Sequence, residues 1–127
     1  MATLKNNRNL KNIYIKLAFQ QAKINLGSTG TNPSVGCIVE KNGSVISTGH
    51  TSIGGRPHAE FNALNKNLNF QGSSIYSTLE PCSHFGKTAP CINKIIEKKC
   101  KKVFFSLIDP DKRSHNQAKK KLKEKKL

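Results

Sequence analysis

The sequence predicts a three-layer α/β/α sandwich in which helices cover both faces of a central mixed sheet. Segments with helical periodicity alternate along the chain with short strand-like segments, and this alternation is typical of layered α/β folds. The chain has 127 residues, which is enough to bury one hydrophobic core but too few for a second domain of ordinary size. We therefore expect a single domain over residues 1–127.

The first half of the chain predicts one helix and two strands. Apolar residues at helical spacing predict a helix over about 9–26, and Gly27 marks its end. Residues 35–40 and 44–49 have the composition of strands and are joined through Asn42-Gly43, a dipeptide typical of tight hairpin turns. Residues 1–8 are expected to be flexible.

The second half predicts two further strands and further helices. Pro57 precedes a helix over about 58–67, and Pro90 opens a helix that runs to Lys99. Residues 74–79 form the third expected strand. The apolar run 103–108 predicts a fourth strand, buried on both faces. A basic tail over 112–127 follows and is expected to be helical.

Three residues have the chemistry of an open metal site. His58 is followed two residues later by Glu60, and Cys82 and Cys91 come later in the chain. One imidazole and two thiolates can hold Zn²⁺ with a fourth position open, as in catalytic rather than structural zinc sites. Zinc lowers the pKa of its bound water to about 7, and a neighbouring carboxylate can then move protons. A histidine, a nearby glutamate and two later cysteines also form the zinc arrangement of nucleobase deaminases.

The two remaining cysteines, Cys37 and Cys100, do not have metal-ligand spacing. Free cysteine usually packs as a small apolar residue, so we expect both to lie in the core.

A longer segment around the zinc cysteines carries a family resemblance. Residues 78–91, TLEPCSHFGKTAPC, resemble the zinc segment of the pyrimidine deaminases of riboflavin biosynthesis, which have the cytidine-deaminase-like fold. Residues 32–37, NPSVGC, and Gly49-His50 resemble the substrate-side strands of this family. Asp109-Pro110-Asp111 falls where its sugar-phosphate loop would be. The resemblance runs from about Tyr14 to Asp111.

The resemblance implies an activity and a set of site residues. The implied enzyme is a hydrolytic zinc deaminase that converts 2,5-diamino-6-ribosylamino-4(3H)-pyrimidinone 5′-phosphate to 5-amino-6-ribosylaminouracil 5′-phosphate. Zn²⁺ would be held by His58, Cys82 and Cys91, and Glu60 would be the catalytic acid and base. The residues implied to contact the pyrimidine ribose phosphate are Asn32, His50, His84, Lys87, Thr88 and Asp109.

Simpler roles stay open for three of these residues. Lys87 could be a solvated loop lysine, and His50 could cap the end of a strand. Asp109 could form an Asp-Pro turn.

The C-terminal part departs from the family pattern. Residues 112–116 replace a glycine-containing stretch, and the sequence stops in the helix that precedes a further edge strand in the family. We therefore expect the sheet to lack its last edge strand, which leaves an edge free for pairing. No reductase domain is expected in this chain, so the expected protein partner is a separate reductase or a second copy of the chain.

The net charge of +15 raises the question of a nucleic-acid partner. More than half of the basic residues lie from Lys94 onward, and residues 119–126 form the densest run. A solvated tail explains this run better than RNA binding, because the tail contains no aromatic residue to stack on bases. The positive field would also favour a phosphorylated small molecule.

Two other functions stay open beside the riboflavin deaminase. A deaminase acting on a nucleoside or on RNA is disfavoured by the spacing of the cysteines. Two residues separate them in the nucleobase deaminase signature, whereas eight residues separate Cys82 from Cys91. A non-catalytic zinc module that binds RNA through the basic tail would not need Glu60.

Composition also predicts the compartment. No apolar run approaches the roughly 20 residues of a membrane helix, and residues 1–12 are polar and basic rather than signal-like. Four cysteines in such a chain are expected to be thiols and metal ligands rather than disulfides. We expect a cytoplasmic protein with no membrane partner.

Overall fold

Helices and strands alternate along the described part of the chain. The computed structural model describes residues 2–83, 88–107 and 117, with the side chains of the first helix described from residue 12 onward. The elements are α1 (Ala2–Ala22), β1 (Gly36–Lys41), β2 (Ser44–His50), α2 (Ala59–Leu64), β3 (Ser74–Leu79), α3 (Cys91–Glu97) and β4 (Lys102–Leu107).

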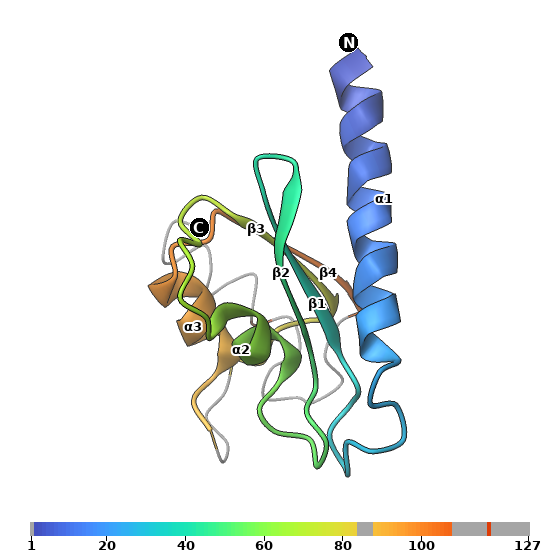
Figure 1. Cartoon of the computed structure of the whole chain (residues 1–127), viewed down its shortest axis with the longest axis vertical. Helices are drawn as coiled ribbons and strands as arrows, with labels where there is room; N and C mark the ends of the chain where they lie inside the picture. The colour runs from blue at the N-terminus through green and yellow to red at the C-terminus, as the bar shows by residue number, and fades with distance from the viewer. Residues whose placement is uncertain (1, 84–87, 108–116, 118–127) are drawn as a thin grey trace.

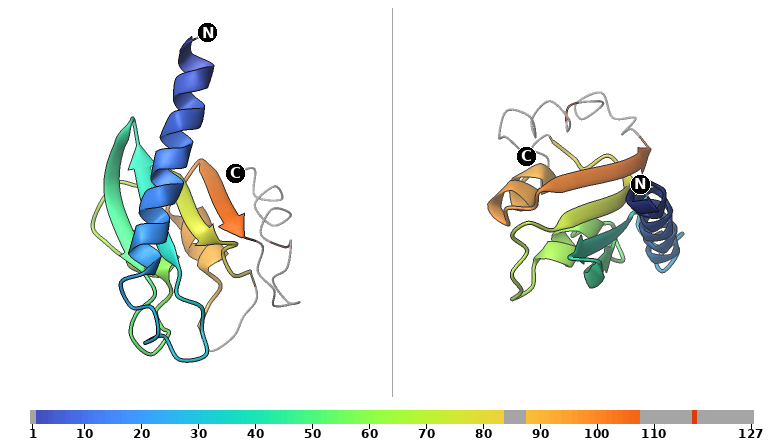
Figure 2. Two further views of the ribbon diagram at one scale, coloured as in Figure 1. Left: turned by 90° about the vertical axis from the view of Figure 1, so that its right-hand side faces the viewer. Right: turned by 90° about the horizontal axis from the view of Figure 1, so that it is seen from above.

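The strands form one mixed sheet with the order β2-β1-β3-β4. β1 is antiparallel to both β2 and β3, whereas β3 and β4 are parallel. Figures 1 and 2 show α1 on one face of the sheet and α2 with α3 on the other. The predicted three-layer arrangement around a mixed sheet is therefore confirmed.

Alternate residues of the central strands build two separate cores. Cys37 and Val39 of β1 join the core that lies under α2 and α3. Ile38, between them, packs on the α1 side with Tyr14 and Ala18. This is the two-residue period expected of a strand that is covered on both faces.

Two glycines let the helices approach the sheet closely. A Cβ atom on Gly49 of β2 would lie 2.3 Å from the backbone oxygen of Ala59 in α2. A Cβ atom on Gly36 of β1 would lie 1.8 Å from the backbone oxygen of Ala18 in α1. Because Cβ atoms do not approach backbone oxygens so closely, only glycine fits at these positions.

The hairpin prediction is confirmed. Lys41 pairs with Ser44, so the turn consists of Asn42 and Gly43 alone. Both residues have positive φ, 53° and 85°, as the favoured two-residue hairpin turn requires.

The helix boundaries differ from the predicted ones. α1 begins at Ala2 instead of residue 9, because no proline or glycine interrupts residues 2–22. It also ends before Gly27. After Ala22, the backbone N–H groups of Lys23 and Ile24 donate to carbonyl oxygens three residues earlier, which is the tighter 3₁₀ pattern. α2 ends at Leu64 rather than 67 because an Asn-rich stretch, which disfavours helix, follows it.

The expectation that residues 103–108 are buried on both faces is wrong. β4 spans Lys102–Leu107, and its residues are half-buried or exposed. The physical reason is its place in the sheet, since β3 is its only strand partner among the described residues. Within those residues no strand lies beyond β4. Of the basic tail over 112–127, which was predicted to be helical, only Gln117 is described, and it is helical.

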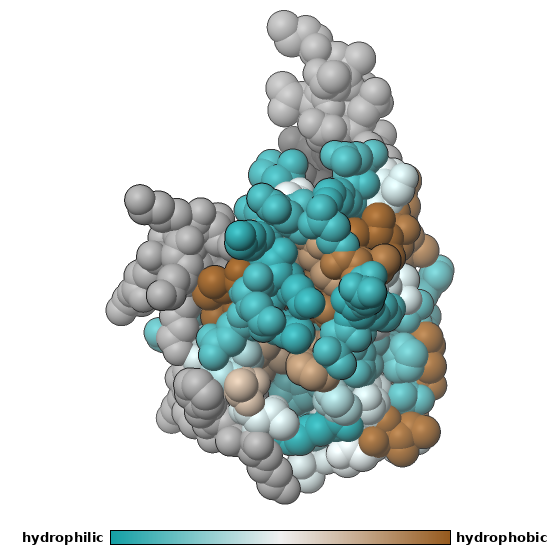
Figure 3. Space-filling model, turned by 60° about the vertical axis from the view of Figure 1, so that its left-hand side comes forward, coloured by the Kyte–Doolittle hydropathy of each residue, from teal (hydrophilic) through white to brown (hydrophobic). Residues whose placement is uncertain are grey.

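Hydrophilic residues dominate one face of the molecule, and hydrophobic residues lie in separated patches on that face (Figure 3). Among the described residues, no helix combines the length and apolar character needed to cross a bilayer.

Candidate active site

The described candidate residues come from the ends of several elements that meet at one edge of the sheet. β2, β3 and β4 end at this edge and β1 begins there, because β1 runs opposite to its two neighbours. α2 and α3 also start at this edge (Figure 1). In α/β sheets, the carboxyl ends of strands are the usual place for a ligand site.

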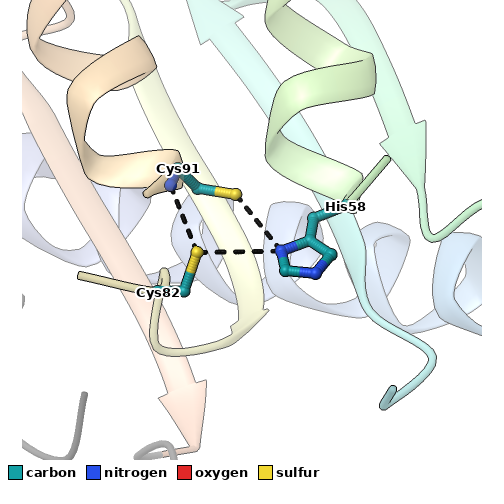
Figure 4. Close-up of side chains that lie close together, drawn as sticks. All are labelled: His58, Cys82 and Cys91. Carbon is teal, nitrogen blue, oxygen red and sulfur yellow. Dashed lines mark hydrogen bonds between the residues drawn. The ribbon is translucent and has the colours of Figure 1, made fainter. Parts of the chain in front are cut away.

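The structure brings the three predicted metal ligands together. His58 Nδ1 lies 3.7 Å from Cys82 Sγ and 3.5 Å from Cys91 Sγ. The three ligand atoms all lie within 4.8 Å of one another. Figure 4 shows the side chains pointing toward one another from the start of α2, the segment after β3 and the start of α3.

Local backbone geometry explains these orientations. His58 is the N-cap residue of α2, yet its side chain makes no capping hydrogen bond, so the imidazole turns to the cysteines instead. The backbone N–H of Cys91, in the first turn of α3, donates to Cys82 Sγ at 3.2 Å. The thiols are thereby held side by side.

The distances fit a tetrahedral zinc ion. Zinc binds thiolate at about 2.3 Å and imidazole at about 2.0–2.1 Å, so the ligand atoms of one tetrahedral ion lie about 3.6 Å apart. The two nitrogen–sulfur distances, 3.7 and 3.5 Å, bracket this value. His58 and Cys82 are half-buried and Cys91 is buried. The donor set is thus suited to zinc in both chemistry and geometry.

The three side chains also perturb one another's protonation. A hydrogen bond from the Cys91 thiol lowers the pKa of Cys82 to about 4, and His58 acts in the same direction. The same contact with Cys82, together with burial, raises the pKa of Cys91 well above its usual range. The hydrogen bond to Cys82 likewise raises the pKa of His58. A divalent cation that binds to these three side chains would therefore have to displace protons from His58 and Cys91.

Glu60 lies beside this cluster. It is 4% exposed, in the first turn of α2 and two residues after His58. Its negative charge contributes to the raised pKa values of His58 and Cys91. A carboxylate with this placement can exchange protons with a molecule bound at the open metal position.

The structure describes three of the six predicted substrate contacts. Asn32 is half-buried just before β1, and its Nδ2 donates to the Gly55 carbonyl oxygen at 2.9 Å. His50 ends β2, and its Nδ1 lies 3.3 Å from Gln21 Oε1 of α1. Thr88 is exposed and lines a cavity of about 260 Å³ that also reaches His58 and Cys91. His84, Lys87 and Asp109 lie outside the described residues.

The remaining cysteines are packing residues, as predicted. Cys37 and Cys100 are 0% and 1% exposed and belong to the core under α2 and α3. Burial is the largest cause of the raised pKa of each thiol.

Sequence reasoning missed the residues that hold the candidates in place. Gln21 contacts His50, as described above, and Asn62 Nδ2 donates to the His50 backbone oxygen at 2.8 Å. Arg56 Nη1 donates to Thr88 Oγ1 at 2.7 Å. Each contact joins segments that are distant in the chain. The only local signal is that Asn62 follows His58 at helical spacing.

Comparisons with known proteins agree with this geometry. Residues 9–107 match the family model described as the cytidine and deoxycytidylate deaminase zinc-binding region. The chain is 42% identical over 99 residues to the diaminohydroxyphosphoribosylamino-pyrimidine deaminase of Buchnera aphidicola (subsp. Acyrthosiphon pisum), covering 77% of this chain and 67% of that protein. It is 41% identical over 105 residues to riboflavin biosynthesis protein RibD of Aquifex aeolicus, covering 82% of this chain and 30% of that protein.

A solved structure shows the same similarity. It is a diaminohydroxyphosphoribosylaminopyrimidine deaminase/5-amino-6-(5-phosphoribosylamino)uracil reductase from Thermotoga maritima, with a TM-score of 0.88 and 35% identity. The match covers 95% of this chain and 36% of that one. The chain thus spans about a third of the RibD and deaminase/reductase proteins and about two thirds of the Buchnera deaminase.

Proposed function

The chain belongs to the cytidine and deoxycytidylate deaminase family with its zinc-binding region, and we propose that it is the pyrimidine deaminase of riboflavin biosynthesis. The proposed reaction is hydrolysis of 2,5-diamino-6-ribosylamino-4(3H)-pyrimidinone 5′-phosphate to 5-amino-6-ribosylaminouracil 5′-phosphate and ammonia. The Buchnera and Thermotoga relatives, which carry the deaminase name, support this substrate.

The main support for the proposal is the cluster of three candidate metal ligands with the Glu60 carboxylate beside it. His58, Cys82 and Cys91 offer three ligands at zinc-compatible distances, which leaves a fourth position for water or substrate. When bound there, zinc supplies a Lewis acid that lowers the pKa of a water molecule toward about 7.

Glu60 carries the proton transfers. Its carboxylate would accept a proton from the attacking water and deliver it to the ring nitrogen next to the amino-bearing carbon. It would then transfer the second water proton to the departing amine, so that the ring gains a carbonyl oxygen and ammonia leaves. General acid–base groups of this kind contribute about 10²–10⁴-fold to the rate. The burial of Glu60 keeps bulk water from competing in these transfers.

Residues around the cluster would hold the substrate. Asn32 would accept a hydrogen bond through Oδ1, because its Nδ2 already donates to Gly55. His50, held by Gln21, would line the pocket on the side of β2. His84, Lys87, Thr88 and Asp109 stay predicted contacts to the ring or to the ribose phosphate.

The proposed protein partner is the reductase of the next step or a second copy of this chain. The reductase activity named for the Thermotoga protein acts on the product of the proposed deamination. The expected cytoplasmic location stays a prediction.

Substrate comparison tests the proposed function. Zinc-loaded protein is incubated with the pyrimidine phosphate, cytidine, deoxycytidylate or an RNA oligomer, and ammonia release is measured. We expect turnover of the pyrimidine phosphate only. Activity confined to RNA and abolished by deleting residues 119–127 would contradict the proposal and favour an RNA deaminase.

A further inference from the structure

One side-chain contact joins the two segments that supply metal ligands from α2 and α3. Arg56 Nη1 donates to Thr88 Oγ1 at 2.7 Å. Arg56 lies two residues before His58, and Thr88 lies three residues before Cys91. Pro57 and Thr88 both line the cavity of about 260 Å³ that reaches these ligands. Arg56 itself does not line this cavity, but its hydrogen bond to the lining residue Thr88 places the guanidinium beside the cavity rim.

Among the described residues, the Arg56 guanidinium makes one side-chain hydrogen bond, so further donors are available. Arginine carries five N–H donors, and the contact with Thr88 uses one of them. Among the described residues, no carboxylate forms an ion pair with Arg56; the pair found there joins Lys94 to Glu97 at 3.8 Å. The Thr88 hydroxyl, which accepts from Arg56, still has its own proton to donate.

Lys94 is a cation that lines this cavity, but its charge is already engaged. Lys94 is paired with Glu97 and also lies 5.3 Å from the centre of the Phe61 ring. Of the two described cations near the metal ligands, Arg56 is thus the one whose charge is not balanced by a described side chain.

We propose that Arg56, oriented by Thr88, binds the 5′-phosphate of the substrate; this inference rests on the proposed function. A guanidinium matches two phosphate oxygens with parallel N–H donors, and a hydroxyl can donate to a third. The contact with Thr88 restrains the guanidinium before the ligand arrives. Arg56 is therefore a substrate-binding residue, and Thr88 is both its positioning residue and a second phosphate donor.

The decisive experiment compares substrates with and without the phosphate. Arg56→Gln should raise the KM for the pyrimidine phosphate about 10- to 100-fold, the usual size of charge-assisted contacts, and change kcat little. For the same riboside without phosphate, KM should not change. Lys101→Gln is the matched control: it removes one charge from an exposed residue just before β4, at the opposite edge of the sheet. It should leave both substrates unaffected.

Two further variants keep the test independent of one substitution. Arg56→Lys keeps the charge but loses the paired donors, so its KM should lie between those of wild type and Arg56→Gln. Thr88→Val should raise the KM for the phosphorylated substrate only. Zinc content should stay at the wild-type level in Arg56→Gln, Arg56→Lys and Thr88→Val. Equal losses for both substrates, or losses confined to kcat or to zinc, would show that the contact only braces the two segments and would overturn the inference.

A binding measurement that requires no turnover distinguishes failure of this inference from failure of the proposed function. Calorimetric titration with ribose 5-phosphate should show binding to wild type that Arg56→Gln weakens about 10-fold or more. Ribose should bind both proteins equally weakly. Equal affinity of the two proteins for ribose 5-phosphate would overturn the inference. Inactivity of wild type on the pyrimidine phosphate would instead overturn the proposed function.

Discussion

Replacing Gly49 with alanine tests how the packing of α2 on β2 positions the metal site. The new Cβ atom would lie 2.3 Å from the Ala59 backbone oxygen and 2.6 Å from the Ala63 backbone nitrogen. Ordinary contact begins at 3.4 Å, so α2 must move away from β2 by about 1 Å. Neither atom belongs to a flexible side chain, so the movement has to involve the helix itself.

The movement should affect both stability and zinc binding. Overpacking a core typically costs 1–3 kcal/mol, and we expect about 3 kcal/mol because backbone must shift. For a domain of this size, such a loss lowers Tm by about 10 °C or more. His58 directly precedes α2 and would move with it, whereas Cys82 and Cys91 would not. Metal sites tolerate only about 0.2 Å of error, so zinc affinity should fall about 10-fold or more.

Thermal unfolding and a zinc titration against a competing chelator measure the two effects. Gly36→Ala is the matched control, because its Cβ atom would also clash with helix backbone, in this case that of α1, and more closely, at 1.8 Å from the Ala18 oxygen. α1 carries none of the metal ligands. Both variants should be destabilised, but only Gly49→Ala should bind zinc more weakly. Unchanged zinc affinity in Gly49→Ala, or the same loss in both variants, would refute the reasoning.

Three further predictions concern the cluster itself. Cys82→Ser should lose most of its zinc in metal analysis, whereas Cys37→Ser, altered in the core, should keep it. Glu60→Gln should keep its zinc and lose about 10⁴-fold in kcat, because one carboxylate serves several proton transfers; near wild-type turnover would contradict the mechanism. Zinc affinity should strengthen as the pH rises from 6 toward 9, because the raised pKa values of His58 and Cys91 mean that both must release protons to bind. It should be lost as the pH falls toward about 4, where the Cys82 thiolate is protonated too; a pH-independent affinity would contradict this.

Local patterns in the sequence predicted the elements whose determinants are local. Asn42-Gly43 specified a two-residue turn because few other residues adopt positive φ twice in succession. The third strand was predicted with the bounds that the structure shows, Ser74–Leu79. The grouping of His58, Cys82 and Cys91 was also predictable, since their residue types and the proline-flanked cysteines are typical of a zinc segment.

Features that depend on tertiary packing could not be predicted in this way. The apolar run of β4 resembles a central strand, but an apolar run alone does not show whether a second strand neighbour exists. Gly49 looks like an ordinary strand residue until α2 lies against it. Arg56 precedes a recognisable motif, yet its partner Thr88 is 32 positions away in the chain.

Two of the three candidate ligands lie at the starts of short helices, and this placement has an energetic consequence. α2 and α3 have six and seven residues, too few for helices that are stable alone, so packing on the sheet holds them in place. Ala59 and Ala63 anchor α2 there, and Ile92 and Ile95 anchor α3. A zinc ion would connect the starts of both helices to each other and to the segment after β3, so its binding energy would stabilise this layer. α1 packs on the opposite face through its own core and supplies no ligand, so its stability depends less on the metal.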